Sequence, residues 1–383
     1  MDASQIVDGL HYPPCSTEKL GRRGILRFSD SDDYARFLHA LPSQNSLSPN
    51  DKFQEVRRLG IIQGVSFPME ALEAKRFPTS MKGDVSWEED CPISVHALQG
   101  GALVTDKGIP WGVRHIQAPQ VWSRTTGYRV KVGVIDTGVD FSHPDLRHSL
   151  ERGINLLHRM AIPQDDNGHG THISGTIAAA NELQGMIGVA PRALIYPVKA
   201  FDHNGTAYVS DIILGIEWCI RNQMDVVNMS FGMKTKSKSL LNAVNNAYRS
   251  GVLIVASSGN DGQVGEIDYP ARYHSSIAVG ATNQQSRIAK FTNRSNLIDI
   301  YAPGERIASA WLRGKHREMS GTSMATSHVT GAIALLLALK PGLTPGQIKS
   351  IIKQSAKPLR NSKTPRMAGE LNVVRMIKAA DNL

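Results

Sequence analysis

The sequence predicts an α/β fold with a mostly parallel, doubly wound sheet and helices on both faces, preceded by a small α+β module. The main observation is a set of short, β-branched runs without polar interruption, as in strands buried on both faces. These runs lie at residues 130–135, 193–198, 226–229, 252–256 and 276–279. Stretches of helical period alternate with them, at 171–180, 210–222, 239–249 and 323–339. This alternation implies parallel crossovers, and such sheets bind ligands at the carboxyl ends of their strands.

The N-terminal part shows a separate and shorter pattern. We expect a strand at 24–28, a helix opened by Ser29, Asp30, Ser31 and Asp32, a strand at 61–67, a helix at 69–75 and an extended stretch at 93–96. Residues 24–98 are therefore predicted as one module that follows an N-terminal extension, 1–23. Residues 99–109 have weak patterning and contain glycine, which indicates a linker before the main domain, 110–383.

Composition excludes several classes of protein. The chain has 383 residues, enough for two or three domains with a large core. Its net charge is +9, but the basic excess gathers after Lys340 without interleaved aromatic residues, so we expect no nucleic-acid partner. The three cysteines form no CxxC pair, which argues against a zinc site or a disulfide framework. The first thirty residues lack an apolar core and no apolar run reaches membrane length, so we expect no signal peptide, no membrane association, and cytoplasmic residence rather than secretion.

Asp136 marks the first of three polar clusters that follow predicted strands or open helices. A buried strand delivers this acid to its carboxyl end, and Thr137 and Gly138 follow at once. By itself such an acid is more often a turn or capping residue than a catalyst. Asp-Thr-Gly is also the signature of aspartic proteases, but their chemistry needs two such motifs and this chain has one.

His169 marks the second cluster, a turn in which Gly168 and Gly170 flank the imidazole. Flanking glycines leave a histidine uncrowded, as a general base requires. The alternatives are two ordinary histidines or a metal pair formed with His172. No further ligand stands at a suitable spacing, so the metal interpretation is weak.

Ser323 stands at the start of the long apolar helix expected at 323–339, and Asn260 follows the strand expected at 252–256. Alone, the serine would be an N-cap and the asparagine a turn residue. Together with an acid and a histidine they form the set that nucleophilic acyl transfer requires: a hydroxyl, a base, an orienting acid and an amide donor for an oxyanion.

These clusters and the motifs around them resemble the subtilisin-like serine proteases, the subtilases. The resemblance extends from residue 110 to about 381. It rests on Val-Ile-Asp-Thr-Gly-Val-Asp at 134–140, His-Pro-Asp-Leu at 143–146, His-Gly-Thr-His at 169–172, Gly-Val-Ala-Pro at 188–191, Asn-Met-Ser at 228–230, Tyr-Pro at 269–270 and Gly-Thr-Ser-Met-Ala at 321–325. It implies a subtilisin-like fold and a serine endopeptidase that hydrolyses polypeptides through an acyl-enzyme, with no cofactor for the chemistry. The implied triad is Asp136, His169 and Ser323, and the implied oxyanion-hole donor is Asn260.

The resemblance also implies where substrate and calcium would bind. Extended substrates would pair with Ser230, Phe231 and Gly232 and with Ser257, Ser258 and Gly259, which would also wall the primary specificity pocket. Asp268 and Asp261 near this pocket suggest acceptance of Lys or Arg before the scissile bond. The implied calcium ligands are Asp145, Ala180, Glu182, Gln184 and Met186. Glu182 stands where the family usually has Asn, and Ser327 where it usually has Pro.

The N-terminal module resembles a subtilase prodomain, which implies a ferredoxin-like α+β fold, an intramolecular chaperone and inhibitor, and a self-processing zymogen. We expect self-cleavage between Leu98 and Pro110, either at Leu98–Gln99 or at Lys107–Gly108. The alternatives are a non-catalytic scaffold, which would be expected to lose a triad residue, and a sedolisin, which would need Glu where His169 stands. A nucleotide-binding protein would need a glycine-rich loop that 134–139 does not supply.

Overall fold

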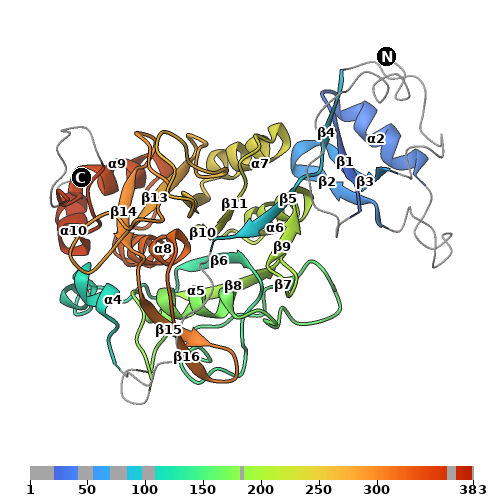
Figure 1. Cartoon of the computed structure of the whole chain (residues 1–383). Coiled ribbons are helices and arrows are strands. Elements are labelled where there is room, and N and C mark those ends of the chain that lie inside the picture. The colour runs from blue at the N-terminus through green and yellow to red at the C-terminus, as the bar shows by residue number, and fades with distance from the viewer. Residues whose placement is uncertain are drawn as a thin grey trace.

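The computed structural model describes residues 21–41, 55–69, 84–96, 108–181, 185–359 and 368–381. In Figure 1 a small N-terminal module stands at one side of a larger domain, and strand β5 (Pro92–Val95) runs from the module into that domain. The expected linker at 99–109 falls outside the described residues except for Gly108 and Ile109.

The larger domain is built on a seven-stranded parallel sheet with the order β14-β13-β12-β10-β6-β8-β7. All five strands predicted for it are present, and their bounds are β6 (Lys131–Asp136), β8 (Leu194–Lys199), β10 (Val226–Met229), β12 (Leu253–Ser257) and β13 (Ser276–Thr282). β7 (Ile154–Asn155) and β14 (Ile300–Pro303) add the two edges. The predicted α/β class with a mostly parallel sheet is therefore confirmed.

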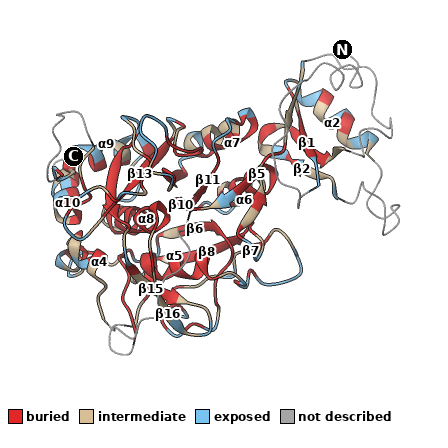
Figure 2. Cartoon of the chain, in the orientation of Figure 1, coloured by how far each residue is buried: buried red, intermediate tan, exposed pale blue. Residues whose placement is uncertain are grey.

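Helices cover both faces of this sheet. Successive side chains of a strand point to opposite faces, so each strand contributes to two hydrophobic cores, one on each side of the sheet. Val132 and Leu253 pack in the core that also contains α5 (His169–Ala178) and α8 (Thr322–Leu339). Ile135 and Ile254 point the other way, into the core that contains α6 (Val209–Arg221) and α7 (Lys238–Arg249). Figure 2 shows the buried residues concentrated in these strands and in α8. α8 is long and apolar enough to cross a membrane, but 89% of that apolar window is buried inside the fold, as in a core helix.

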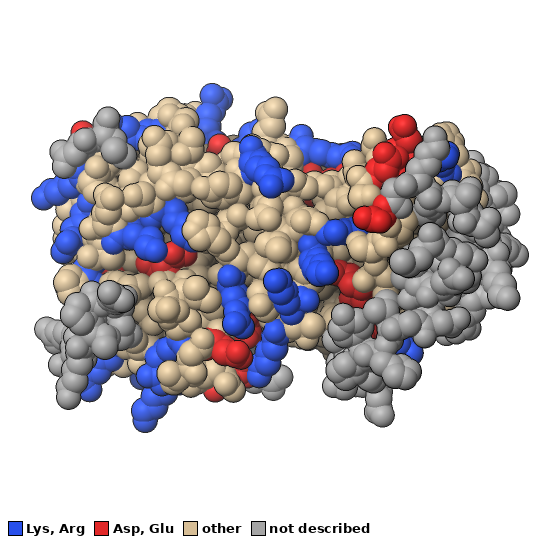
Figure 3. All heavy atoms as spheres, turned by 90° about the horizontal axis from the view of Figure 1, so that it is seen from above, with Lys and Arg blue, Asp and Glu red and all other residues tan. Residues whose placement is uncertain are grey.

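The remaining elements surround this sandwich. The helical ones are α4 (Trp111–His115), η4 (Ala118–Val121), α9 (Pro345–Ser355) and α10 (Val373–Asp381). A hairpin of β15 (Ile307–Trp311) and β16 (Lys315–Met319) packs on α5 (Figure 1). On the face in Figure 3, Lys and Arg side chains are dispersed among other residues and form no continuous basic patch.

The N-terminal module contains an antiparallel sheet of order β2-β3-β1-β4, which is the strand order of the ferredoxin-like fold. Its strands are β1 (Arg23–Phe28), β2 (Arg57–Leu59), β3 (Gly64–Pro68) and β4 (Val85–Glu89), and a 3-10 turn η3 (Gly60–Ile62) joins β2 to β3. α2 (Ser31–Ala40) begins where predicted, because the Asp30 carboxylate accepts the amide hydrogens of Asp32 and Asp33. Of the helix predicted at 69–75, only Met69 lies within the described residues.

Carboxylates of the module dock against the amino ends of two helices in the larger domain. Glu88 accepts hydrogen bonds from Ser237 Oγ (2.6 Å), Lys238 N (2.9 Å) and Ser239 N (3.1 Å) at the start of α7. Asp90 accepts one from Ser210 N (2.9 Å) in the first turn of α6. A helix amino end carries free N–H groups and a partial positive charge, so both carboxylates are favourably placed.

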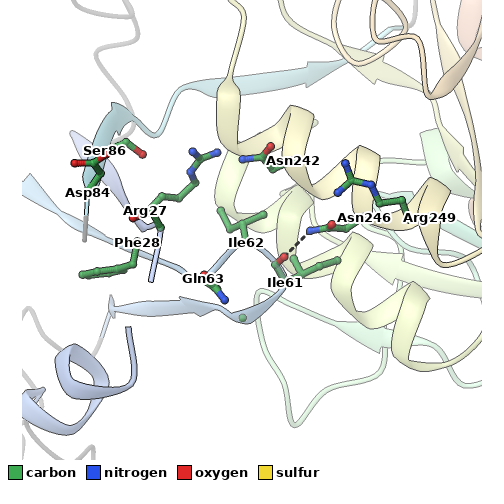
Figure 4. A pocket seen from close by; sticks show the side chains of 12 residues that line it. Arg27, Phe28, Ile61, Ile62, Gln63, Asp84, Ser86, Asn242, Asn246 and Arg249 are labelled. Carbon is green, nitrogen blue, oxygen red and sulfur yellow. Dashed lines mark hydrogen bonds between the residues drawn. The ribbon is translucent and has the colours of Figure 1, made fainter. Parts of the chain in front are cut away.

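A cavity of about 550 Å³ remains beside this contact, between the module and α7 (Figure 4). Arg27 and Gln63 line it from the module, and Asn242 and Arg249 line it from α7. At its inner edge a hydrogen bond from Asn246 Nδ2 to Ile61 O (2.6 Å) ties α7 to the module. Apolar packing also joins the two parts, because Leu59 and Ile62 of the module are buried in the same core as residues of α6 and α7, with the hollow beside them.

Candidate active site

Asp136 and His169 meet at the carboxyl edge of the sheet. Asp136 ends β6 and His169 opens α5, and His169 Nδ1 lies 2.7 Å from Asp136 Oδ1. Both side chains are almost completely buried. Gly170 permits this approach, since a Cβ there would lie 2.1 Å from the carbonyl oxygen of Gly138. The predicted pairing of acid and base is therefore present.

A second set of contacts fixes the turn that carries Asp136. Thr137 Oγ1 donates to Asp165 Oδ1 (2.8 Å) and accepts from Gly170 N (3.0 Å), which ties the end of β6 to the start of α5. The buried Lys199 Nζ donates to Thr137 O (2.6 Å) and to Asp166 Oδ1 (2.7 Å). Sequence reasoning did not single out Lys199 or Asp165, because neither stands within a motif.

Ser323 lies in the first turn of α8, and its hydroxyl faces two carbonyl oxygens. Ser323 Oγ is 2.5 Å from His96 O and 2.8 Å from Ser230 O. His169 Nε2 is buried and has no hydrogen-bond partner within the described part of the chain. The hydrogen bond expected between His169 Nε2 and Ser323 Oγ is therefore not among the described contacts. The Ser323 hydroxyl instead faces the carbonyl oxygens of His96, in the N-terminal module, and of Ser230, in the larger domain.

Asn260 faces the same space with a free amide group. Its Oδ1 accepts from Thr322 N (2.9 Å) and Thr322 Oγ1 (2.9 Å), which fixes the side chain and directs Nδ2 away from Thr322. Among the described residues Nδ2 is buried without an acceptor. A Cβ on Gly321 would approach both Asn260 Nδ2 (3.1 Å) and His96 O (2.6 Å), so the two atoms border one small volume.

The segments expected to bind substrate enclose strand β5 of the N-terminal module. β5 pairs with β11 (Phe231–Gly232) on one side and with β9 (Thr206–Tyr208) on the other, both antiparallel. Ser230, Phe231 and Gly232 were expected from the sequence, whereas β9 was missed because it is only three residues long.

The residues expected to wall the specificity pocket differ in what they contact. Ser257 and Asp268 contact the His96 side chain. Ser258 Oγ instead lies 3.2 Å from Asn293 O, and Gly259 N lies 3.3 Å from Thr322 Oγ1.

The two acids expected near this pocket differ in their contacts. Asp261 Oδ2 lies 3.4 Å from Lys234 Nζ and 3.4 Å from Asn293 Nδ2, and the Asp261 side chain is 44% exposed. It stands one residue beyond Asn260, where the chain leaves the cleft for the surface. Only Asp268 of these two acids therefore contacts His96.

Asp145 lies where calcium binding was expected, but nitrogen donors already surround its carboxylate. Oδ1 accepts from Asn181 Nδ2 (2.8 Å), and Oδ2 accepts from Met186 N (3.0 Å) and lies 2.6 Å from His316 Nε2. Burial raises the pKa of this carboxyl, but the hydrogen bonds from His316, Met186 and Asn181 outweigh it and hold the pKa below its ordinary value.

Calcium needs six to eight oxygen ligands, and among the described residues the oxygens around Asp145 are already engaged in hydrogen bonds. Ala180 and Met186 lie beside Asp145 as expected, but the Met186 carbonyl accepts from Asn181 N (3.0 Å). Glu182 and Gln184 lie outside the described residues. His143 and His316 converge on Asp145, although no sequence pattern joins His316 to the other two residues.

His172 is a structural histidine and does not pair with His169 as a metal ligand. Its Nε2 lies 3.0 Å from Ile307 O and 3.1 Å from Arg317 O, both on the β15–β16 hairpin. Burial lowers the pKa of His172 to about 3, so the ring is neutral and donates to these carbonyls.

Comparison with known proteins agrees with this geometry. Residues 127–370 match the model of the Subtilase family of peptidases. The chain is 44% identical over 261 residues to Subtilisin E of Bacillus subtilis (strain 168), covering 67% of this chain and 68% of that protein. It is 43% identical over 261 residues to Subtilisin of Bacillus pumilus, covering 67% and 94%. It is also 36% identical over 345 residues to Alkaline protease of Alkalihalobacillus alcalophilus, covering 90% and 88%.

The chain therefore belongs to the subtilase family. It is a serine endopeptidase, and its peptide-bond chemistry requires no cofactor. The match to Alkaline protease covers 90% of the chain, so it extends beyond the larger domain into the N-terminal module.

Proposed function

We propose that the chain is the zymogen of a serine endopeptidase whose triad is Asp136, His169 and Ser323. The observation that carries the proposal is a pair of buried nitrogens without hydrogen-bond partners in the described structure, His169 Nε2 and Asn260 Nδ2. Other buried atoms of the described residues, such as His172 Nδ1, also lack partners, so these two support the proposal through their place: His169 pairs with Asp136, and Asn260 Nδ2 borders the volume that contains His96 O. These two are the acceptor and the donor that acyl transfer needs.

In the proposed mechanism Ser323 Oγ attacks the carbonyl carbon before the scissile bond while His169 Nε2 accepts the hydroxyl proton. Asp136 Oδ1, 2.7 Å from His169 Nδ1, holds the proton on that nitrogen and stabilises the imidazolium that forms. Asn260 Nδ2 and the Ser323 amide, in the first turn of α8, donate to the oxyanion. His169 then gives its proton to the leaving amine, and water hydrolyses the resulting acyl-enzyme by the reverse steps.

Catalysis requires the Ser323 hydroxyl to turn from its present contacts toward His169. A rotation of χ1 would move Oγ away from His96 O and Ser230 O, the two carbonyls it now faces. Catalytic hydrogen bonds are often formed only in the complex with substrate, so this rearrangement fits the proposal.

We further propose that the N-terminal module is an intramolecular inhibitor and folding aid. β5 fills the groove between β9 and β11, which an extended substrate would occupy. Glu88 and Asp90 fasten the module to α7 and α6 by hydrogen bonds to helix amino ends. Such a module blocks the cleft of the enzyme to which it is bound.

A structural calcium ion at Asp145 would have to displace the hydrogen bond from His316 Nε2. The test is the melting temperature of the Ser323→Ala chain, which cannot digest itself, with and without calcium. A rise with calcium that Asp145→Asn abolishes would support an ion at this place, and no rise would argue against it.

The experiment that tests the triad is casein hydrolysis by wild type and by Ser323→Ala, His169→Ala and Asp136→Asn. We expect each change to lower turnover by about 10⁴-fold or more. The matched control is Ser327→Ala, four residues along α8, because the hydrogen bond of Ser327 Oγ within the described chain stays inside its own helix, to Met324 O (2.8 Å). Activity retained by Ser323→Ala, or lost equally by Ser327→Ala, would refute the assignment.

A further inference from the structure

We propose that the primary specificity pocket is built to receive a histidine side chain, and that the protease cuts its own chain after His96. This inference rests on the proposed function and specifies its substrate and its processing site. It replaces the expectation of a Lys- or Arg-accepting pocket formed by two acids. It also places the processed bond upstream of Leu98–Gln99 and Lys107–Gly108, which lie outside the described residues except for Gly108.

The backbone of His96 lies where the residue before a scissile bond belongs. Its carbonyl oxygen is 2.5 Å from Ser323 Oγ, and its amide donates to Ser230 O (3.0 Å). The preceding residue, Val95, is in register with Phe231 of β11. An extended chain bound in this way brings the His96 carbonyl beside the nucleophile, and for attack its oxygen would turn from Ser323 Oγ toward Asn260 Nδ2, which borders the same volume. The bond that follows is His96–Ala97.

The His96 side chain fills a cavity that the pocket walls leave for it. Only 9% of the residue is exposed. A Cβ on Gly232 would lie 2.3 Å from His96 Cε1, so the absence of a side chain at 232 makes room for the ring. The imidazole therefore lies against the backbone of β11, with the end of β12 beyond it.

Each ring nitrogen has one polar partner in the pocket. His96 Nε2 lies 2.9 Å from Asp268 Oδ2, and Nδ1 lies 2.8 Å from Ser257 Oγ. Nε2–H donates to the carboxylate in either protonation state of the ring. The Ser257 hydroxyl donates to Nδ1 when the ring is neutral and accepts from it when the ring is charged.

Other side chains would leave these partners unsatisfied. Asp268 and Ser257 are 7% and 0% exposed, so Leu or Phe in the pocket would leave Asp268 Oδ2 and the Ser257 hydroxyl buried without the partners that His96 gives them. Lys would reach the carboxylate but would not offer Ser257 a ring nitrogen. A site that hydrogen-bonds its substrate strongly rejects analogues that lack the matching group.

The charges around the pocket agree with this selectivity. Asp268 Oδ1 is 3.5 Å from the neutral amide Asn293 Nδ2, which also lies 3.4 Å from Asp261 Oδ2. The Lys234 ammonium pairs with Asp261 rather than with Asp268. Within the described ranges His96 is the one ion-pairing partner of Asp268.

The self-processing step is ordinary acyl transfer. Ser323 Oγ forms an ester with the His96 carbonyl carbon, the bond from that carbon to Ala97 N breaks, and the serine proton passes through His169 to Ala97 N. Water then hydrolyses the ester, which leaves His96 with a free carboxylate and Ala97 with a free amine.

The first test is the intact mass of the purified full chain. Wild type should lose residues 1–96 and begin at Ala97, and the Ser323→Ala chain should stay whole. His96→Leu should slow this processing at least tenfold. A wild-type product that begins at Gln99, Gly108 or another residue would overturn the assignment of the bond.

The second test is hydrolysis of matched peptides by the processed enzyme, with His, Lys, Leu or Phe before the scissile bond and all other positions identical. We expect kcat/KM for the His peptide to exceed the others at least tenfold. Asp268→Asn should lower the His-to-Phe ratio at least tenfold. Asp261→Asn removes the same charge nearby without contacting His96, and should leave the ratio within twofold.

The readout is a ratio, so a variant with less folded enzyme still reports selectivity. A wild-type preference for Leu or Phe, or a ratio that Asp268→Asn leaves unchanged, would overturn the histidine pocket while leaving the protease assignment intact. Absence of hydrolysis of every peptide and of casein would refute the proposed function itself, and the two failures are thereby distinguished.

Discussion

Glu88 offers a quantitative test of how the N-terminal module is held. Its carboxylate accepts two backbone amides and one hydroxyl at the start of α7, at 2.6–3.1 Å. A hydrogen bond to a charged group contributes about 1.5–3 kcal/mol, and a charge at a helix amino end about 0.3–1 kcal/mol. Lys238 is exposed, so water replaces part of what Glu88→Ala removes. We expect a loss of about 2–3 kcal/mol, which weakens binding of the processed module by about 30- to 150-fold.

The assay is serial dilution of the processed enzyme with its module, followed by peptide hydrolysis. Activity appears when dilution releases the module, so the half-activation concentration should rise by the same factor in Glu88→Ala. Glu89→Ala is the matched control, because it removes an adjacent acid that makes none of the α7 contacts described. A half-activation concentration within twofold of wild type, or an equal shift in Glu89→Ala, would refute this account of docking.

Two further predictions concern the catalytic domain. Asn260→Leu should lower kcat by about 10²–10³-fold with little change in KM, a magnitude taken from the equivalent experiment on subtilisin itself, and an unchanged kcat would exclude Asn260 from the oxyanion hole. Burial lowers the pKa of His328 to about 4, below the ordinary value of 6.5, so the unfolded chain binds this proton first as pH falls. Stability in the Ser323→Ala chain should therefore fall between about pH 6.5 and 4, with about 3 kcal/mol due to this group. In His328→Gln the urea midpoint should change less with pH over that range. A midpoint that falls with pH as steeply as in the parent chain would contradict the assignment.

The main strands were predictable because burial on both faces leaves a strong local signal. β10 (Val226–Met229) has the predicted bounds, and β6 and β8 differ from theirs by one residue at each end. The short strands β9 and β11 carry no such signal, since they consist of two or three residues that become strands by pairing with β5. β16 (Lys315–Met319) is polar and forms only as the partner of β15.

The candidate site was predictable where residues stand in motifs and not where they meet through the fold. Asp136 and His169 were expected to pair, and they lie 2.7 Å apart. The contact between His96 and Asp268 joins residues far apart in the chain, so no local sequence pattern predicts it. Asp261 adjoins Asn260 in the sequence, yet its carboxylate is 44% exposed and pairs with Lys234, a contact that no local pattern indicates.

The central claim is that Ser323 is a nucleophile activated by His169, and covalent labelling tests it most directly. The processed enzyme would be treated with a fluorophosphonate, digested, and mapped by mass spectrometry. We predict one adduct on Ser323, none in Ser323→Ala, and labelling slowed at least 10³-fold in His169→Ala. An adduct on another residue, or equal labelling of wild type and His169→Ala, would contradict the mechanism.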